Sequence, residues 1–349
     1  MAIQFKSTDV FQKILLQRVN EYFKNNNVGK YANGAMIVKM VCIIILWILS
    51  IISIFTIKTT FPGYVFLYVL HGLCSILVIF NISHDAVHQA LFRNKFINNI
   101  FGYSFNLLGG NKYSWYLKHN IGHHNFTNIH GKDIDIETAP LFRISPYTPL
   151  KKHYRFQHLY ILPLYCFLSL ALILVIDFVV MFKIKPGGKK PAVKEWMILF
   201  CSKFIYLGYI ILALAYFLQL TLFEVIICFF VMHAVIGFFI SLVLLSSHFI
   251  EHASYYKVVA DSKLSSSWPE HQLLTTIDIA PENKMANLLL GGLNANIIHH
   301  ILPNICHIHF IPLSKILRHT AEEYNMPYIA FTFKQALKEH FIFLKKMGR

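Results

Sequence analysis

The stretch Lys118-His119-Asn120-Ile121-Gly122-His123-His124 decides how this chain is interpreted. On a helix, His119 and His123 lie one turn apart on the same face, and His124 lies beside them. Each buried imidazole needs hydrogen-bond partners for two ring nitrogens, so three of them are unfavourable as simple packing. Neutral imidazole is, however, the commonest protein ligand for transition metals. Alone, the stretch is equally compatible with a metal site and with a polar surface cluster.

The composition indicates a membrane protein. Of the 349 residues, 56% are hydrophobic and 15% aromatic, and the mean hydropathy is +0.50. This is too apolar for a soluble globular protein. The chain also has 32 Lys and Arg against 17 Asp and Glu, an excess typical of membrane proteins whose cationic face meets anionic headgroups. No basic tract stands apart, which argues against nucleic-acid binding.

Four apolar segments are each long enough to cross a bilayer, for which about 20 residues suffice. The first two are joined by a very short link, and so are the last two, which predicts two antiparallel hairpins. These spans cover approximately residues 35–57, 63–83, 196–220 and 222–247.

A fifth apolar segment, residues 159–182, contains Pro163 and Asp177 and is followed by a basic loop at residues 183–190. The positive-inside rule favours this loop on the same side as the N-terminus. If residues 159–182 crossed the membrane, the loop and the later histidines would lie on the other side. We therefore expect this segment to lie in the membrane interface.

The expected fold is an all-α membrane protein with four transmembrane helices in two hairpins, interfacial helices and a cytosolic helical cap. Residues 1–34 are expected to form a cytosolic or interfacial N-terminal segment, and residues 35–349 a single membrane domain. The histidines would then face the cytosol. In a bacterium, the membrane would be the inner membrane.

Three histidine clusters lie next to the ends of these spans. His84 and His88 are one helical turn apart, the quoted stretch adds three imidazoles, and His299 and His300 form a doublet. Histidines that bind headgroups or sense pH would not need repeated helical pairs and two doublets, so we favour metal binding. All-histidine sites suit zinc and copper as well as iron. Seven imidazoles exceed what one ion can take, which predicts two ions.

The segments HDAVH (84–88), HNIGHH (119–124) and NIIHH (296–300) resemble, in order and spacing, the three histidine boxes of the membrane fatty acid desaturase superfamily. The surrounding texts TNIHGKDIDIE, HQLLTT and GGLNANIIHHILPNICHIH resemble the branch of acyl-lipid and linoleoyl-CoA-type desaturases. The similarity runs from about residue 30 to the C-terminus.

This resemblance implies an oxygen-dependent oxidoreductase that introduces a carbon–carbon double bond into a fatty acyl chain carried by CoA, a carrier protein or a lipid. It implies two non-haem irons, dioxygen as co-substrate and its reduction to water. A fused cytochrome-b5-type domain, present in some relatives, is not recognised. We therefore expect a separate electron donor, a ferredoxin or cytochrome-b5-type protein with its reductase, and the basic face suits an acidic donor.

The resemblance also implies the metal ligands, and no catalytic residue beyond them is expected. Asp133 and Asp135 match the family's acidic pair and are expected behind the ligands or fixing their loop. The implied ligands are His84, His88, His119, His123, His124, His248, His299 and His300.

Three further residues have suitable places near these ligands. Asp85 can hold a ligand imidazole in one tautomer, and Glu251, three residues after His248, is placed for the same role or for the surface. Asn296 begins the third box, where the family has His or Gln. Its carboxamide offers a weak ligand oxygen or a hydrogen bond to a ligand or water.

The remaining histidines receive weaker predictions. His233 lies within a span, about 60° around the helix from His248, and is a candidate for lining a substrate tunnel. His71 is interpreted as a packing histidine. His252, His307 and His309 are expected at the surface or behind the ligands.

Two other functions remain open from the sequence. A fatty acyl or lipid hydroxylase of the same superfamily uses a similar set of boxes and differs in its product. A haem-binding membrane cytochrome would instead use single histidines on facing spans. A third function, metal transport, is disfavoured because it would need more polar residues within the spans.

Overall fold

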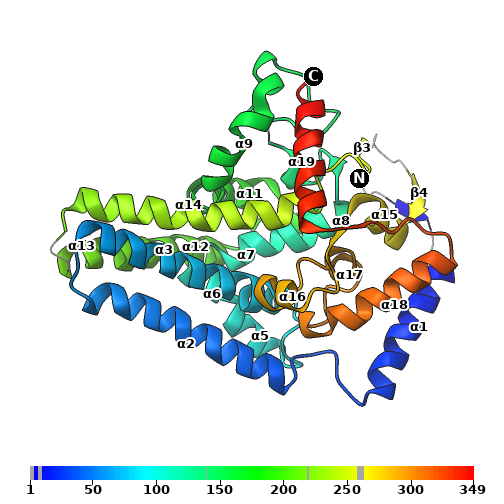
Figure 1. Ribbon diagram of the computed structural model, residues 1–349, viewed down its shortest axis with the longest axis horizontal. Coiled ribbons are helices and arrows are strands. Elements are labelled where there is room, and N and C mark those ends of the chain that lie inside the picture. The colour runs from blue at the N-terminus through cyan, green and yellow to red at the C-terminus, as the bar shows by residue number, and fades with distance from the viewer. Residues whose placement is uncertain (1–3, 7–9, 139, 218–219, 258–262) are drawn as a thin grey trace. The chain divides into compact units, whose positions relative to one another are not determined.

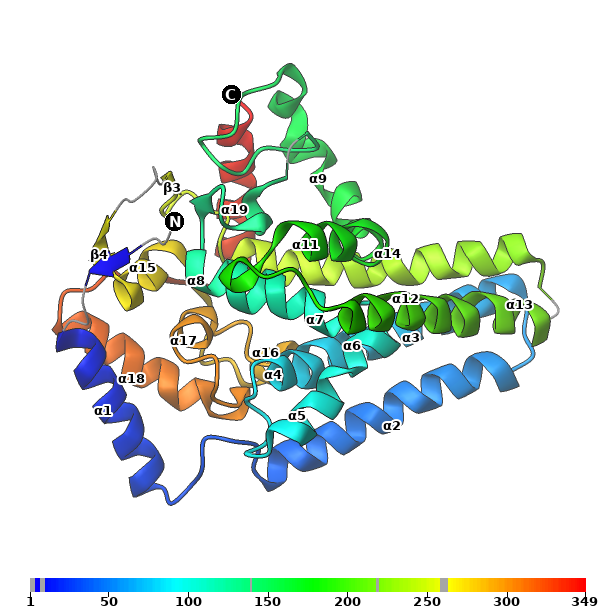
Figure 2. The same ribbon diagram turned by 180° about the vertical axis from the view of Figure 1, so that it is seen from behind.

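The computed structural model describes residues 4–6, 10–138, 140–217, 220–257 and 263–349 (Figures 1 and 2). These residues form an all-α membrane protein in which six short strands accompany the helices. The chain divides into two compact units. The first comprises residues 1–33, 122–161 and 243–349, and the second comprises residues 34–121 and 162–242.

Four helices of the described chain are long and apolar enough to cross a membrane, and they correspond to the four predicted spans. α2 (Gly34–Thr56) packs along α3 (Phe61–Val78), and many of its large apolar side chains face outward, as lipid contact requires. The full set of candidate spans is Gly34–Thr56, Phe61–Val87, Val193–Phe217 and Leu222–Ser246.

Two of these spans are interrupted by π-helical turns, which in proteins often accompany functional sites. The span that begins with α3 continues through η1 (Ile79–Ser83) into α4 (His84–Val87), so the first histidine box directly follows a π turn. The third span consists of α12 (Val193–Leu207), η7 (Gly208–Ala213) and α13 (Leu214–Phe217), and the fourth is α14 (Leu222–Ser246).

The fifth apolar segment is bent rather than straight. Lys152–Cys166 and Leu168–Lys183 meet at an angle of 63°, as a broken span or a re-entrant loop would. Gly237 of α14 lies so close to the bend that a Cβ there would be 2.6 Å from the carbonyl oxygen of Cys166. The segment comprises η4 (Lys152–Phe156), α9 (Gln157–Cys166), α10 (Leu168–Ala171), η5 (Leu172–Ile176) and α11 (Asp177–Lys183).

Asp177, which is unusual in an apolar segment, pairs with a buried lysine. Its carboxylate contacts Nζ of Lys203 on α12, and the same ammonium group donates to the carbonyl oxygen of Gly109. A charge in an apolar environment is tolerated when it is paired and hydrogen-bonded. This ion pair therefore holds α11 against α12 and the loop before the second histidine box.

In the first unit, α1 (Val10–Asn25) packs against α18 (Phe310–Glu323), and both views show the two helices side by side (Figures 1 and 2). The apolar face of α1 is buried in a core that includes Leu15, Leu313 and Leu317. Arg18 pairs with Glu323 at 2.6 Å. The apolar side chains on one face of α1 are thus buried against protein.

The remaining elements of the first unit are short. Three two-stranded parallel sheets pair β1 (Gln4–Lys6) with β4 (Lys263–Ser267), β2 (Ile129–His130) with β3 (Tyr256–Lys257), and β5 (Asp278–Ile279) with β6 (Ala330–Phe331). The helices are α8 (His124–Phe126), η3 (Ile134–Ile136), α15 (Trp268–Thr275), α16 (Lys284–Leu290), α17 (Asn296–Ile301), η8 (His307–His309) and α19 (Phe333–Met347).

The second unit contains, besides its spans, short helices around the first two boxes. These are α5 (Lys95–Gly102), α6 (Ser104–Leu107) and α7 (Lys112–Trp115), and η6 (Pro186–Gly188) lies in the basic loop. The π-helix η2 (Tyr116–His123) carries most of the second box.

Candidate metal centre

The second histidine box lies on a π-helix, η2, and not on the α-helix that its spacing suggests. His119 and His123 are both on η2, yet each joins a different group of histidines. His119 lies with the first box in the second unit, whereas His123 lies with histidines of the first unit. The structure therefore contains two groups of possible ligands, as two ions would require.

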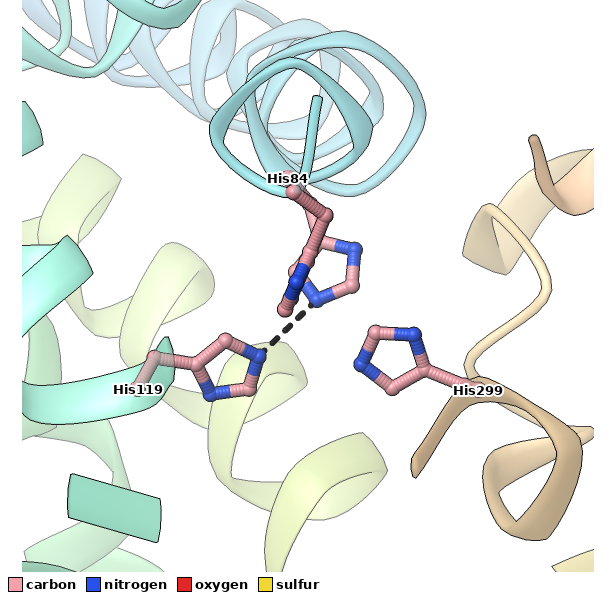
Figure 3. Close-up of side chains that lie close together, drawn as sticks. His84, His119 and His299 are labelled. Carbon is pink, nitrogen blue, oxygen red and sulfur yellow. Dashed lines mark hydrogen bonds between the residues drawn. The ribbon is translucent and has the colours of Figure 1, made fainter. Parts of the chain in front are cut away.

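The group in the second unit consists of His84, His88 and His119, all of which are buried. Nε2 of His84 lies 3.1 Å from Nε2 of His119, and Figure 3 shows these two rings pointing toward one another. One ring nitrogen from each of the three lies within 4.8 Å of the others. An ion about 2.1 Å from each nitrogen would bring ligand atoms to such separations, so this donor set fits a transition metal.

Asp85 lies next to this group. Its Oδ1 is 3.8 Å from Nδ1 of His84, and both residues are buried. Trp115 covers another side of the group, with its ring 5.0 Å from that of His119. The surroundings of these three histidines therefore include the buried carboxylate of Asp85 and the ring of Trp115.

The group in the first unit consists of His123, His248 and His300. Nε2 of His123 lies 3.3 Å from Nε2 of His248, and one ring nitrogen of each of the three lies within 4.8 Å of the others. All three side chains are buried. The arrangement again matches the spacing of ligand atoms around one ion.

The other nitrogen of each ring in this group lies near an oxygen. Nδ1 of His123 lies 3.0 Å from Oδ2 of Asp133, Nδ1 of His300 lies 2.9 Å from Oε1 of Gln272, and Nδ1 of His248 lies 3.2 Å from the carbonyl oxygen of Thr275. Because these oxygens accept, each Nδ1 carries the proton and each Nε2 keeps its lone pair. Such outer partners orient metal-binding histidines.

Burial keeps the rings of His248 and His300 neutral. Desolvation, with His123 as a further cause, lowers the pKa of His248 to about 3, and desolvation and the neighbouring histidines hold the pKa of His300 well below its ordinary value. A metal binds imidazole only in the neutral form. His248 and His300 are therefore in a metal-binding protonation state at ordinary pH.

His124 and His299 lie beside these three rings. The rings of His124 and His300 are stacked with centroids 4.3 Å apart, and that of His299 is 4.7 Å from His124. Gln272 contacts both stacked residues: its Nε2 donates to the carbonyl oxygen of His124 at 3.0 Å, and its Oε1 lies 2.9 Å from Nδ1 of His300. Because the carbonyl oxygen of His124 can only accept, Nε2 of Gln272 must face it, which leaves Oε1 facing His300.

The loop after the second box supports His123 through Asp133. The buried carboxylate of Asp133 accepts from the N–H of Asn128 and of Asp135 as well as from His123. Oδ2 of Asp135 is 3.5 Å from Nδ1 of His123. The amide Nδ2 of Asn128 lies 3.3 Å from the carbonyl oxygen of His248, so this loop also holds a second member of the group.

The third box is held at its first turn by a buried carboxyl group. Oδ1 of Asp278 accepts from the N–H of Ile297 at 2.8 Å, and Oδ2 accepts from the hydroxyl of Tyr328 at 2.6 Å. Burial raises the pKa of Asp278 to about 7. Asn296, at the start of the same helix, has its Nδ2 2.8 Å from Nε2 of His248.

Several predicted residues lie elsewhere. Glu251 is exposed and pairs with Lys346 at the surface. His252 is exposed as well. His307 and His309 are buried, which excludes the surface as one of the two places expected for them.

The two histidines within the spans hydrogen-bond inside the second unit. His233 lies 2.7 Å from the hydroxyl of Tyr206 and 3.1 Å from that of Ser169, and Nδ1 of His71 lies 2.8 Å from the hydroxyl of Ser50. Polar partners of this kind explain why ionisable side chains are stable between apolar helices.

Sequence reasoning missed four residues that support the groups: Gln272, Thr275, Asp278 and Tyr328. Gln272 and Thr275 lie in HQLLTT, whose polar residues are otherwise unexplained on a buried helix. Asp278 follows two residues later. Only Tyr328 has no local signal, because its contact spans 50 residues.

The fold and these groups define an integral membrane protein with buried histidine clusters suited to transition metals. The family model for fatty acid desaturases matches residues 59–332. The chain belongs to this family, as an oxidoreductase of lipid metabolism.

Curated relatives cover nearly the whole chain. It is 32% identical to the sn-1 linoleoyl-lipid 6-desaturase of a Synechocystis species, over 99% of this chain and 98% of that protein. It is 29% identical to the enzyme of the same name from Arthrospira platensis, over 99% and 95%. The acyl-lipid (8-3)-desaturase of Physcomitrium patens is 27% identical over 97% of this chain and 72% of its own length.

Proposed function

We propose that this protein is an oxygen-dependent desaturase that acts on the acyl chain of an intact membrane lipid. The relatives that match over their whole length are named as linoleoyl-lipid desaturases, which supports a lipid-linked substrate. The active site would lie on the cytosolic side, where the electron donor and its reductase are found.

The observation that carries this proposal is the common orientation of three rings. Nε2 of His123 faces Nε2 of His248, one ring nitrogen of His300 lies within 4.8 Å of a nitrogen of each, and an oxygen lies near Nδ1 of all three. We propose that this group holds one iron and that His84, His88 and His119 hold a second. His124 and His299 complete the eight imidazoles.

When bound, iron would supply the oxygen activation that removal of hydrogen from an unactivated C–H bond requires. The side chains of this protein have three other tasks. Asp133, Gln272 and the Thr275 carbonyl fix the ring tautomers. Asn296 presents its carboxamide beside His248, either as a weak ligand or as a hydrogen-bond partner for water. Burial of the histidines excludes bulk water from the reacting carbon.

A cavity of about 520 Å³ in the second unit is a suitable place for the acyl chain. It is almost entirely apolar and lies between α2, η1, α5, α6 and α12. Ser104 lines it, and its hydroxyl lies 2.6 Å from that of Ser83, the residue before His84. An acyl chain in this cavity would therefore approach the first histidine box.

The proposal is tested by expressing the gene in a host that lacks the product and locating double bonds by mass spectrometry of intact lipids. A new double bond is expected, and a hydroxylated chain would support the hydroxylase alternative. Iron per protein is measured in the same preparations. His248→Ala should lose product and at least part of the iron, whereas His71→Ala, which changes a histidine bonded to Ser50, should keep both.

Asn296→Ala separates a ligand role from a supporting role. Since a carboxamide is a weak ligand, this variant should lose activity and keep most of its iron. If Asn296→Ala loses iron as His248→Ala does, Asn296 is a ligand in its own right. If His248→Ala keeps two irons and a normal yield, the proposed ligand set is wrong.

A further inference from the structure

The first unit carries a cationic patch that the proposed chemistry leaves unexplained. It combines the start of η4 with the end of α19, and each of its side chains is exposed. We define the cationic patch as Lys151, Lys152, Arg155, Lys345, Lys346 and Arg349. Within it, Lys346 pairs with Glu251, so one acidic group offsets part of the charge.

The two halves of the patch are held together by buried hydrogen bonds. Nε2 of Gln157 donates to the carbonyl oxygen of Leu344 at 2.7 Å, and Nη1 of Arg143 donates to that of Met347 at 2.8 Å. Gly348 permits the close approach, since a Cβ there would lie 2.1 Å from the carbonyl oxygen of Tyr154. Both views show the end of α19 beside the green segment that leads into α9 (Figures 1 and 2).

The inner face of α19 leads directly to His248. The ring of Phe343 stacks on that of Tyr255 at 5.5 Å and 7°, and the Tyr255 hydroxyl donates to the carbonyl oxygen of His248 at 3.2 Å. One turn earlier, Nδ1 of His340 lies 2.7 Å from the carbonyl oxygen of Phe249. One helix therefore carries cations on its outside and, on its inside, contacts the carbonyl oxygen of Phe249 and the ring of Tyr255, which in turn bonds His248.

We propose that the cationic patch docks a small acidic one-electron carrier protein, and that Phe343 and Tyr255 form a packed route from it to His248. This inference rests on the proposed desaturase function. Each turnover then consumes one dioxygen, two electrons from the carrier and two protons from water. The acyl chain supplies two hydrogen atoms, which carry the other two protons and the other two electrons. It gains a double bond, and two waters form.

Charge complementarity favours such a carrier. Exposed cations steer an acidic partner into encounter, and this effect weakens as salt screens the charges. Complexes of redox partners are small and transient, so a patch of this extent on two short elements suffices. Anionic lipid headgroups would also be attracted by six cations, but they would not require the aromatic contact with the histidine group.

The test compares two triple charge reversals in the full-length protein in lipid nanodiscs. The patch variant is Lys151→Glu, Lys152→Glu and Lys345→Glu, which spares the Lys346–Glu251 pair. The control is Lys13→Glu, Lys24→Glu and Lys284→Glu, three exposed lysines elsewhere in the same unit. The donor is an acidic ferredoxin with its reductase. In parallel, dithionite, a small-molecule reductant that needs no docking surface, reduces the protein without oxygen and is removed before oxygen is admitted for a single turnover.

We expect the patch variant to raise the KM for ferredoxin about tenfold at low salt, and the difference to shrink at high salt. The patch variant should match the wild type in product formed with dithionite and in iron content. The control variant should match the wild type in every measurement. Phe343→Leu should slow reduction by ferredoxin more than reduction by dithionite. An unchanged KM for ferredoxin in the patch variant overturns the docking proposal. If the same variant also binds anionic lipid vesicles less well, the patch serves lipid headgroups instead. Failure of the wild type to form a double bond with either reductant would instead overturn the desaturase proposal itself.

Discussion

Nδ1 of His300 lies 2.9 Å from Oε1 of Gln272, and this single contact connects two motifs 28 residues apart. The same amide accepts from the hydroxyl of Thr127 at 3.1 Å and donates to the carbonyl oxygen of His124 at 3.0 Å. Gln272 thus links the second and third boxes through one buried side chain. It orients His300 without contacting any metal that His300 would bind.

The first prediction concerns this amide. Gln272→Leu removes the acceptor for His300 and leaves buried polar groups unsatisfied. Loss of an outer partner typically costs 10–100-fold in metal affinity or activity, so we expect about that loss in product yield with reduced iron. Gln272→Glu keeps the acceptor and should retain most of the iron. Equal iron content in Gln272→Leu and the wild type would contradict an orienting role.

The second prediction concerns pH and Asp278. Burial raises its pKa to about 7, above its ordinary value of 3.8. The folded protein therefore keeps this proton between about pH 4 and 7, where the unfolded chain has released it. By linkage, the stability contributed by the neutral carboxyl is present below pH 4 and is lost as pH rises through 7.

Asp278→Asn should remove this pH dependence, because its carboxamide is neutral throughout and its oxygen still accepts from Ile297. We expect the thermal unfolding midpoint of the wild type to be lower at pH 8 than at pH 5. The midpoint of the variant should decrease less over the same range. Asp278→Ala, which lacks the acceptor, should be less stable at every pH. Parallel curves for the wild type and Asp278→Asn would show that Asp278 does not titrate in this range.

The sequence predicted the spans and the boxes because both depend on local patterns. A run of about 20 apolar residues suffices for a span, and the helical repeat places His84 near His88. The sequence did not predict that His119 and His123 belong to different groups, because a π-helix cannot be recognised from residue spacing. Nor did it show that Glu251 pairs with Lys346, which lies 95 residues away.

The third prediction tests the cavity as the acyl site. Ser202 of α12 lines it, so Ser202→Phe should fill part of the 520 Å³ and shorten the longest chain that is desaturated. The control is Phe204→Trp, two residues later, which is exposed and does not line the cavity. Product profiles across chain lengths are compared by mass spectrometry. If both variants keep the wild-type profile, the acyl chain binds elsewhere.

The last prediction concerns the bent segment, which decides the side of the later histidines. With four spans, the loop at Thr60 faces outward and Lys189 faces the cytosol. A fifth crossing by Lys152–Lys183, which the length and composition of that segment also permit, would place Lys189 outside with Thr60. Single cysteines at these positions, in a chain whose six native cysteines are replaced by serine or alanine, are treated with an impermeant thiol reagent on intact cells. We expect labelling at Thr60 alone, because the basic loop favours the cytosol. Labelling of both positions from outside would establish the fifth crossing and separate the first two boxes from the third.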